Sequence, residues 1–269
     1  MGGAPFFYMQ QSLKIKERIM DALSVIILAA GKGTRMKSDL PKVLHKVAGK
    51  SMLAHVIASA MQVTRDNIHV VVGHQAEKVR REVAAFYKVG FCFQDQLLGT
   101  GDAVKSALPH LAAHIKDVLV LCGDVPLIQP ETLADLVMVH RTHGAAVTVL
   151  AADLENPSGY GRIIQDAQGN MVAIREETDA SADEKKIRRI NTGIYCFDRC
   201  FLSRAVELLR PDNRQGEYYL TDVVDIGVKN KKKIAVTVLA DHRQVLGINT
   251  LEELEKAQDL IGRMENELP

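Results

Sequence analysis

The stretch LSVIILAAGKGTRM, residues 23–36, joins an apolar, β-branched run to a loop of glycine, lysine, threonine and arginine. An apolar run of this length that ends at a turn signal predicts a buried strand, here over residues 23–29. Gly31 and Gly33 allow the backbone N–H groups of the following loop to turn toward a ligand. The stretch therefore predicts a buried strand that leads into an anion-binding loop.

Three cations follow this strand, Lys32, Arg35 and Lys42, and they favour a phosphorylated ligand. Two familiar phosphate motifs do not fit the loop. A dinucleotide fingerprint needs a third glycine where Met36 stands, and a Walker loop needs a hydroxyl residue after Gly-Lys, where Gly33 stands. The loop thus disfavours both an NAD-dependent oxidoreductase and a P-loop NTPase.

Outward from this loop, strand-like and helix-like segments alternate along the chain. Further strands are predicted at 68–72, 91–93, 118–122, 145–152, 190–197 and 234–239, and helices at 52–63, 75–87, 100–108, 131–143, 199–209, 221–228 and 251–263. Thr100 is expected to cap its helix. This alternation predicts an α/β fold, with a Rossmann-like, mostly parallel central sheet and helices on both faces. Ligands then bind at the carboxyl ends of the strands.

The pattern changes after about residue 153. Residues 161–165 and 171–175 flank the turn sequence AQGN, residues 167–170, which is a hairpin signal. We therefore expect a small antiparallel β insertion within an otherwise mostly parallel fold.

The composition limits the classes of partner. The chain has 269 residues, of which 47% are hydrophobic, and its 34 Lys and Arg balance 33 Asp and Glu. A net charge of +1 gives no global field for nucleic acid or for an anionic membrane. No apolar run approaches the roughly 18 residues of a membrane span, and the first twenty residues lack a signal-peptide core. We expect a cytoplasmic protein.

Cysteine and histidine give no metal pattern. The cysteines lie within or beside apolar runs, which predicts reduced core thiols: they are Cys92, Cys122, Cys196 and Cys200. His140 and His143 lie three residues apart on a predicted helix edge, and we expect a solvated pair.

The stretch from Leu28 to Met36, together with Leu40-Pro-Lys42, resembles the signature of the nucleotidyltransferases that join a nucleoside triphosphate to a sugar 1-phosphate. Within this family it looks most like the amino-terminal pyrophosphorylase domain of bacterial bifunctional N-acetylglucosamine-1-phosphate uridyltransferase/glucosamine-1-phosphate acetyltransferase. The resemblance runs from about residue 23 to residue 249. It implies Mg²⁺-dependent transfer of UMP from UTP to N-acetyl-α-D-glucosamine 1-phosphate, which gives UDP-N-acetylglucosamine and pyrophosphate for peptidoglycan and lipopolysaccharide precursors.

The resemblance also implies a nucleotide site. Arg35 and the loop amides would hold the leaving phosphates, and Lys42 would lie near the α-phosphate, so these two side chains are the expected catalytic residues. Gln94 would hydrogen-bond the base edge. The other expected nucleotide contacts are Leu28, Ala29, Ala30, Gly31, Gly33, Thr34, Gly99, Thr100 and Gly123.

Mg²⁺ and the sugar would lie beside the nucleotide. Asp124 and Asn249 match the family's metal ligands, and a carboxylate with an amide oxygen suits the few protein ligands that Mg²⁺ takes. Gly161, Glu176 and Asn191 match the stretches that hold the N-acetylglucosamine moiety, and Glu177 is the alternative to Glu176. The attacking sugar phosphate is already an anion, so no general base or covalent nucleophile is required.

The implied organisation has three parts: an arm at 1–22, the nucleotidyltransferase domain at 23–249 and a C-terminal helix at 250–269. Within the domain, a nucleotide-binding lobe is expected at about 23–125 and a sugar-binding lobe at about 126–249. Bifunctional relatives continue into hexapeptide repeats that this sequence lacks, so we expect no acetyltransferase activity.

Two other functions stay open at this stage. One is a nucleotidyltransferase that uses another nucleoside triphosphate or another sugar 1-phosphate. The other is a non-catalytic protein that binds a nucleotide sugar.

Overall fold

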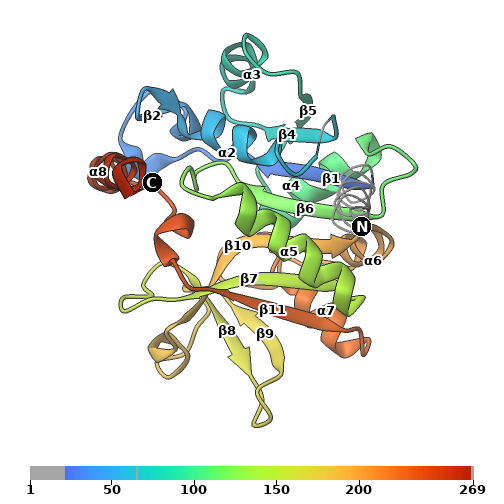
Figure 1. The fold of residues 1–269 in the computed structure, drawn as a ribbon. Helices are drawn as coiled ribbons and strands as arrows, with labels where there is room; N and C mark the ends of the chain where they lie inside the picture. The colour runs from blue at the N-terminus through green and yellow to red at the C-terminus, as the bar shows by residue number, and fades with distance from the viewer. Residues whose placement is uncertain (1–21, 65, 268–269) are drawn as a thin grey trace, which may run out of the picture.

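A nine-stranded sheet forms the centre of the structure, a computed structural model that describes residues 22–64 and 66–267 (Figure 1). Seven strands form its main path in the order β11-β7-β10-β6-β1-β4-β5. Their bounds are β1 Leu23–Leu28, β4 Ile68–Val72, β5 Gly90–Phe93, β6 Asp117–Cys122, β7 Val147–Asp153, β10 Arg189–Asp198 and β11 Ile234–Leu239. The predicted amino-terminal arm, apart from Ala22, lies outside the described residues.

The strand β1 lies in the middle of the parallel half of the sheet. Val25 pairs with Ile68 of β4 on one side and with Leu119 of β6 on the other, both in parallel. Strands covered on both faces need apolar side chains on both, which explains why β1 reads as a continuous apolar run. Strands β4 and β5 are also parallel, and so are β7 and β11. The predicted mostly parallel sheet is confirmed. Along its main path, β10 differs and runs antiparallel between β6 and β7.

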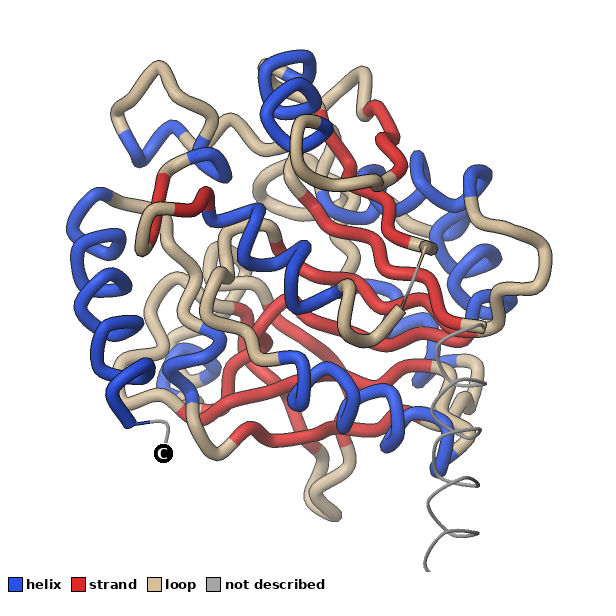
Figure 2. The backbone as a smooth tube through the Cα atoms, turned by 45° about the horizontal axis from the view of Figure 1, so that its top comes forward, coloured by secondary structure: helices blue, strands red, loops and turns tan. Residues whose placement is uncertain are grey.

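Helices cover both faces of the sheet, as predicted (Figure 2). Their bounds are α2 Met52–Ala60, α3 Ala76–Ala84, α4 Thr100–Ala107, α5 Pro130–His143, α6 Arg199–Ala205, α7 Asp222–Lys229 and α8 Leu251–Glu267. One buried cluster holds Leu53 of α2 and Leu133 of α5, and the cluster on the other face holds Val104 of α4, Leu202 of α6 and Val223 of α7. None of the helices in the described ranges is long and apolar enough to cross a lipid bilayer.

The start of α4 differs from the prediction. Thr100 does not cap the helix, because Gly99 occupies the N-cap position with φ 116° and no side chain caps it. The Thr100 hydroxyl instead accepts a hydrogen bond from the backbone N–H of Leu220 at 3.0 Å. The Thr100 hydroxyl, which the sequence pattern assigned to a local helix cap, thus bonds a residue that is distant in the chain.

The predicted hairpin is present as β8 (Gly161–Gln165) and β9 (Met171–Arg175), which pair antiparallel. The carboxylate of Asp166 accepts backbone hydrogen bonds from Gln168 at 3.0 Å and Asn170 at 2.8 Å, and this closes the turn. Because β8 also pairs with β10, the hairpin is attached to the central sheet.

The helix α8 packs through a third buried cluster beside the predicted anion-binding loop, residues 29–36, which is called the phosphate loop below. This cluster joins Leu254 and Ala257 of α8 to Met36 in the 3₁₀-helix η1 (Thr34–Met36) and to Val47 of the short strand β2 (Lys46–Val47). The strand β3 (Lys50–Ser51) pairs with β2, and the sequence patterns predicted neither of them. The C-terminal helix therefore lies against the loop where the phosphates are expected.

The prediction of four core thiols holds for Cys92 and Cys196, which are buried, and is wrong for Cys200, which is exposed at the start of α6. All four cysteines are free thiols, as predicted. Cys122 is half-buried.

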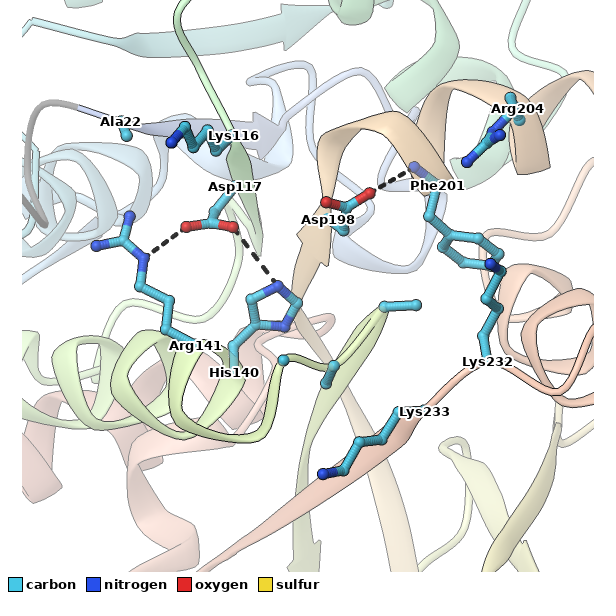
Figure 3. Close-up of a pocket in the computed structure, with 13 residues that line it drawn as sticks. Ala22, Lys116, Asp117, His140, Arg141, Asp198, Phe201, Arg204, Lys232 and Lys233 are labelled. Atoms are coloured by element: carbon cyan, nitrogen blue, oxygen red, sulfur yellow. Dashed lines mark hydrogen bonds and ion pairs between the residues drawn. The ribbon is translucent and has the colours of Figure 1, made fainter.

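A polar cavity of about 590 Å³ lies at the amino ends of β6 and β7, at the edge opposite the phosphate loop (Figure 3). His140 is only 2% exposed there, so the prediction of a solvated pair is wrong for this residue. Its ring lies 2.9 Å from the Thr148 hydroxyl and 3.7 Å from the Asp117 carboxylate, which itself accepts from Arg141 at 2.5 Å. Helix α5 directs His140 toward β7. The spacing of His140 and His143 along the helix did not reveal this direction.

The pKa of His140 gives a test of this packing. Burial lowers it below the usual 6.5, and the Asp117 carboxylate acts in the opposite direction. Because the unfolded chain binds the proton more readily, the neutral ring contributes stability above about pH 6.5, and this contribution is lost as the pH falls below that value. Urea unfolding at pH 7.5 and pH 5 should therefore show a smaller acid-induced loss of stability in His140→Gln than in the wild type. The exposed control His143→Gln should behave as the wild type, and equal losses in all three proteins would contradict the argument.

Candidate active site

The phosphate loop begins where β1 ends, at the edge where the carboxyl ends of β1, β4 and β6 meet. Gly33 adopts a left-handed conformation, with φ 60° and ψ 35°, just before η1. A Cβ atom at Gly33 would lie 2.5 Å from the Cβ of Lys42. Glycine at this position therefore allows the loop to pass directly against the stem of Lys42.

A cavity of about 530 Å³ opens above this edge. Eleven of the predicted site residues line it: Leu28, Ala29, Ala30, Gly31, Gly33, Thr34, Lys42, Gln94, Gly99, Thr100 and Asp124. Lys32, predicted as one of the loop cations, also lines the cavity. The glycine loop and residues 94–100, which include Gln94 and are called the base-reading segment below, thus share one cavity.

A charged cluster lies at the side of this cavity. The ammonium group of Lys42 contacts the carboxylate of Asp124 and donates to the Oδ1 of Asn249 at 2.9 Å. The guanidinium of Arg35 donates to the same Oδ1 at 2.8 Å. The two predicted catalytic residues and the two predicted metal ligands, which come from three distant parts of the chain, therefore meet at one place.

The oxygen atoms of this cluster fit a hard cation. The carboxylate of Asp124 and the amide oxygen of Asn249 both contact Lys42 Nζ, so they face one point that a positive charge already occupies. Mg²⁺ takes oxygen ligands and is usually held by one or two protein groups together with phosphate oxygens and water. Asp124 and Asn249 are the residues that would hold such an ion.

Gly123 connects Asp124 to the sheet. Its N–H donates to the carbonyl of Leu28 at 2.9 Å, and a Cβ atom at this position would lie 3.0 Å from the same oxygen. The end of β6 is therefore drawn close to the end of β1, which places Asp124 beside the phosphate loop.

The base-reading segment presents an acceptor. Gln94 is 6% exposed, and its side-chain nitrogen donates to the carbonyl of Gly99 at 3.0 Å and to Asp102 at 2.8 Å. Both donor positions of the amide are used within the protein, so the group that Gln94 offers to a ligand is its carbonyl oxygen.

The predicted sugar residues gather in a second group, outside the lining of the cavity. A Cβ atom at Gly161 would lie 3.4 Å from the Oε2 of Glu176 and 3.5 Å from the Cβ of Asn191. Glu176 is largely buried and accepts from the Thr221 hydroxyl at 3.1 Å. Burial raises the pKa of its carboxyl group, and the Thr221 hydrogen bond acts in the opposite direction. Asn191 Nδ2 donates to the Tyr195 hydroxyl at 2.6 Å.

The neighbouring Glu177 has a different environment. It accepts from Arg162 at 2.8 Å, and Arg162 is 1% exposed. It also accepts from the backbone N–H of Gly159 at 3.3 Å. Glu177 is thus engaged as the partner of a buried cation, whereas Glu176 lies with Gly161 and Asn191.

Cys122 lies between the cavity and the group of predicted sugar residues. Its side chain lines the cavity, and its Sγ donates to the carbonyl of Gly193, on the same strand as Asn191, at 3.4 Å. Burial raises the pKa of its thiol to about 12, and the Asp124 carboxylate adds to this shift. The thiol is therefore protonated and neutral at this position.

Sequence reasoning missed part of the lining. Val43, Leu97 and Ala103 are apolar walls of the cavity, and the sequence motifs assigned no role to them. Glu217 also lines this cavity. Its neighbour Tyr218 donates its N–H to the carbonyl of Leu98 at 2.7 Å, which holds this segment against the base-reading segment.

The central sheet is mostly parallel and has helices on both faces. Its carboxyl edge carries a glycine loop and a lysine–carboxylate–amide cluster, which is the arrangement expected of a nucleotidyltransferase. The structure is similar to that of a putative glucose-1-phosphate thymidylyltransferase from Bacillus anthracis, with a TM-score of 0.67 and 20% identity, over 89% of this chain and 95% of that one. At this identity the likeness concerns the fold. The chain belongs to the MobA-like NTP transferase domain family, whose profile matches residues 25–211.

Two curated relatives show which proteins of this kind the chain resembles in sequence. The bifunctional protein GlmU of Pelotomaculum thermopropionicum is 48% identical over 241 residues, which cover 90% of this chain and 52% of the relative. The bifunctional protein GlmU of Desulfotalea psychrophila is 44% identical over 244 residues, which cover 91% of this chain and 72% of the relative. The chain therefore spans about half the length of the first relative. The predicted family, with its GlmU-like character, is confirmed.

The close approach of the phosphate loop to Lys42 can be tested with two glycines. Gly33→Ala should lower the free energy of unfolding by about 1–3 kcal/mol, because it combines a left-handed backbone with a clash against the stem of Lys42. Gly31→Ala is the matched control, since its Cβ would have no atom within 4 Å. Urea unfolding measures both, and a Gly33→Ala protein as stable as Gly31→Ala would contradict this account of the loop.

Proposed function

We propose that this chain transfers UMP from UTP to N-acetyl-α-D-glucosamine 1-phosphate and releases pyrophosphate. The observation that carries the proposal is the meeting of Arg35, Lys42, Asp124 and Asn249 beside the nucleotide cavity. The identity of 48% to a GlmU protein over 90% of the chain supports the choice of base and sugar. The product would serve peptidoglycan and lipopolysaccharide precursor synthesis.

The reaction brings two polyanions together, so its main demands are positioning and charge neutralisation. Arg35 and the amides of the glycine loop would bind the β- and γ-phosphates, which leave as pyrophosphate. Lys42 would bind oxygens of the α-phosphate, where negative charge accumulates in the transition state. A Mg²⁺ ion held by Asp124 and Asn249 would neutralise phosphate charge when bound.

No proton has to be removed from the nucleophile. A phosphate oxygen of the sugar 1-phosphate forms the new bond to the α-phosphorus, and the bond from the α-phosphorus to the bridging oxygen breaks, its electron pair leaving with pyrophosphate. Because the sugar phosphate is ionised at neutral pH, the protein needs no general base. Its side chains serve to hold the attacking and leaving groups on opposite sides of the α-phosphorus.

Base choice would depend on Gln94. Its free carbonyl oxygen can accept from the N3–H of uracil. Cytosine and adenine present an unprotonated ring nitrogen at the corresponding edge, which would face this oxygen without a proton between them. The amide of Gln94 is prevented from reversing its orientation, because its nitrogen already donates to Gly99 and Asp102.

The sugar would be held by the group of Gly161, Glu176 and Asn191. A carboxylate accepts hydrogen bonds from sugar hydroxyls. Glycine at position 161 lets strand β8 lie close to Glu176 and Asn191, because a Cβ atom there would be only 3.4 Å and 3.5 Å from them. The second oxygen of Glu176 lies toward Gly161, while the first accepts from Thr221. This arrangement favours Glu176 over Glu177 as the sugar contact.

Pyrophosphate release tests the proposal directly. Four nucleoside triphosphates crossed with several sugar 1-phosphates should give the highest rate for UTP with N-acetylglucosamine 1-phosphate.

Asp124→Asn should lower the Mg²⁺-dependent rate at least about 100-fold, because it removes the only charged ligand proposed for the ion. Asp135→Asn is the matched control, since Asp135 is exposed on α5 and does not line the cavity. An equal rate with glucose 1-phosphate would contradict the sugar, and near-normal turnover in Asp124→Asn would contradict the site.

Glu176 and Glu177 give a paired test of the sugar site. Glu176→Gln should raise the KM for the sugar 1-phosphate about tenfold or more, through weaker hydrogen bonds to the sugar. Glu177→Gln should leave that KM within about twofold and lower the stability by about 1–3 kcal/mol, because the buried Arg162 loses its partner charge. Initial rates and urea unfolding measure the two effects. If the KM effect fell on Glu177 instead, the assignment would be reversed.

A further inference from the structure

We infer that Glu253, in the first turn of α8, is a positioning residue that fixes Asn249 in the cation site. The inference rests on the proposed function, because it concerns the same Mg²⁺ ligand. The Oε2 atom of Glu253 accepts from the backbone N–H of Asn249 at 2.6 Å and from that of Thr250 at 3.1 Å. The backbone N–H of Glu253 in turn donates to the Thr250 hydroxyl at 3.2 Å. Glu253 and Thr250 thus form a capping box. The Glu253 carboxylate also accepts from the backbone N–H of Asn249, the proposed metal ligand, which lies just outside the box.

The two amides before Asn249 are also held. The N–H of Gly247 donates to the hydroxyl of Tyr160 at 3.2 Å, and the N–H of Ile248 donates to the carbonyl of Asp124 at 2.9 Å. Four consecutive N–H groups, residues 247–250, therefore have partners, and two of them share the carboxylate of Glu253. The Ile248 bond also joins the backbones of the two proposed cation ligands.

The helix that carries Glu253 is anchored next to the phosphate loop. Leu254 is 9% exposed and Ala257 is 3% exposed, and both pack in one buried cluster with Met36. Met36 directly follows Arg35, which donates to Asn249. Glu253 is thus presented from a helix whose position relative to the loop is set by packing, so its carboxylate can fix the backbone of Asn249 relative to Arg35.

The physical consequence concerns cation affinity. An ion held by only two protein oxygens depends on both being placed before it binds, and loss of a residue that orients a ligand typically weakens metal binding 10–100-fold. Without the Glu253 carboxylate, the N–H groups of Asn249 and Thr250 lose their acceptor and the segment can relax. A residue that only capped the helix would affect the stability of α8 and leave the cation affinity unchanged.

Four single variants of the full chain separate these roles. Glu253→Ala removes the acceptor, and Glu253→Gln keeps an oxygen that can accept. Thr250→Ala removes the hydroxyl that caps the helix but leaves the Glu253 contact to the Asn249 N–H. Glu252→Ala removes an equal charge from the same turn at an exposed side chain.

Two measurements report on the inference. Titration with Mn²⁺, followed by electron paramagnetic resonance of the free ion, should give a Kd about tenfold or more higher in Glu253→Ala and less than about threefold higher in Glu253→Gln. Thr250→Ala and Glu252→Ala should stay within about twofold of the wild type. Hydrogen exchange without any metal should be faster in residues 247–250 of Glu253→Ala than in the same residues of Glu252→Ala.

The outcomes distinguish this inference from the proposed function. A Glu253→Ala protein that binds Mn²⁺ as the wild type does, or that loses affinity no more than Thr250→Ala, would overturn the positioning role and leave the proposed function intact. A wild-type protein that binds no Mn²⁺ would overturn the metal site itself, and with it both proposals.

Discussion

The contact of the Lys42 ammonium with the carboxylate of Asp124 and the amide oxygen of Asn249 is the interaction on which the candidate site depends. Lys42 and Asp124 are largely withdrawn from water, with side chains 16% and 22% exposed. Charges in such an environment need partners. Each of the three groups comes from a different segment, so the contact requires the 3₁₀-helix that starts at Lys42, the end of β6 and the residues just before α8 to lie at one place.

The sheet makes this meeting possible. Because β1, β4 and β6 are parallel, their carboxyl ends lie at one edge, and each delivers a loop to it. Glycine then removes the steric obstacles: Gly33 lets the loop pass Lys42, and Gly123 lets the end of β6 approach β1. The candidate site is therefore assembled at the edge of an α/β sheet, with glycine at two places of close backbone approach.

Much of this architecture could be predicted from the sequence. The apolar runs predicted the strands, the 3.6-residue periodicity predicted the helices that cover the sheet, and the turn 167–170 predicted the hairpin.

Periodicity along one segment carries no information about its direction in a sheet, so the antiparallel course of β10 was not foreseen. The burial of His140 and the partner of Thr100 were missed because both depend on contacts between separate elements, with Asp117 of β6 for His140 and with Leu220 for Thr100. The individual site residues came from motif resemblance, and their roles stay predictions. The sequence Thr250-x-x-Glu253 is a local capping signal, but its bond to Asn249 is visible only in three dimensions.

One measurement tests the central claim most directly: the position of a bound divalent ion. Crystals grown with Mn²⁺ and UTP, and measured at the manganese absorption edge, should show an anomalous peak between the Asp124 carboxylate and the Asn249 amide oxygen. The same crystals should show the Lys42 ammonium on the phosphate oxygens of the nucleotide. A nucleotide bound with its manganese at another site, and with Lys42 still on Asp124 and Asn249, would contradict the account.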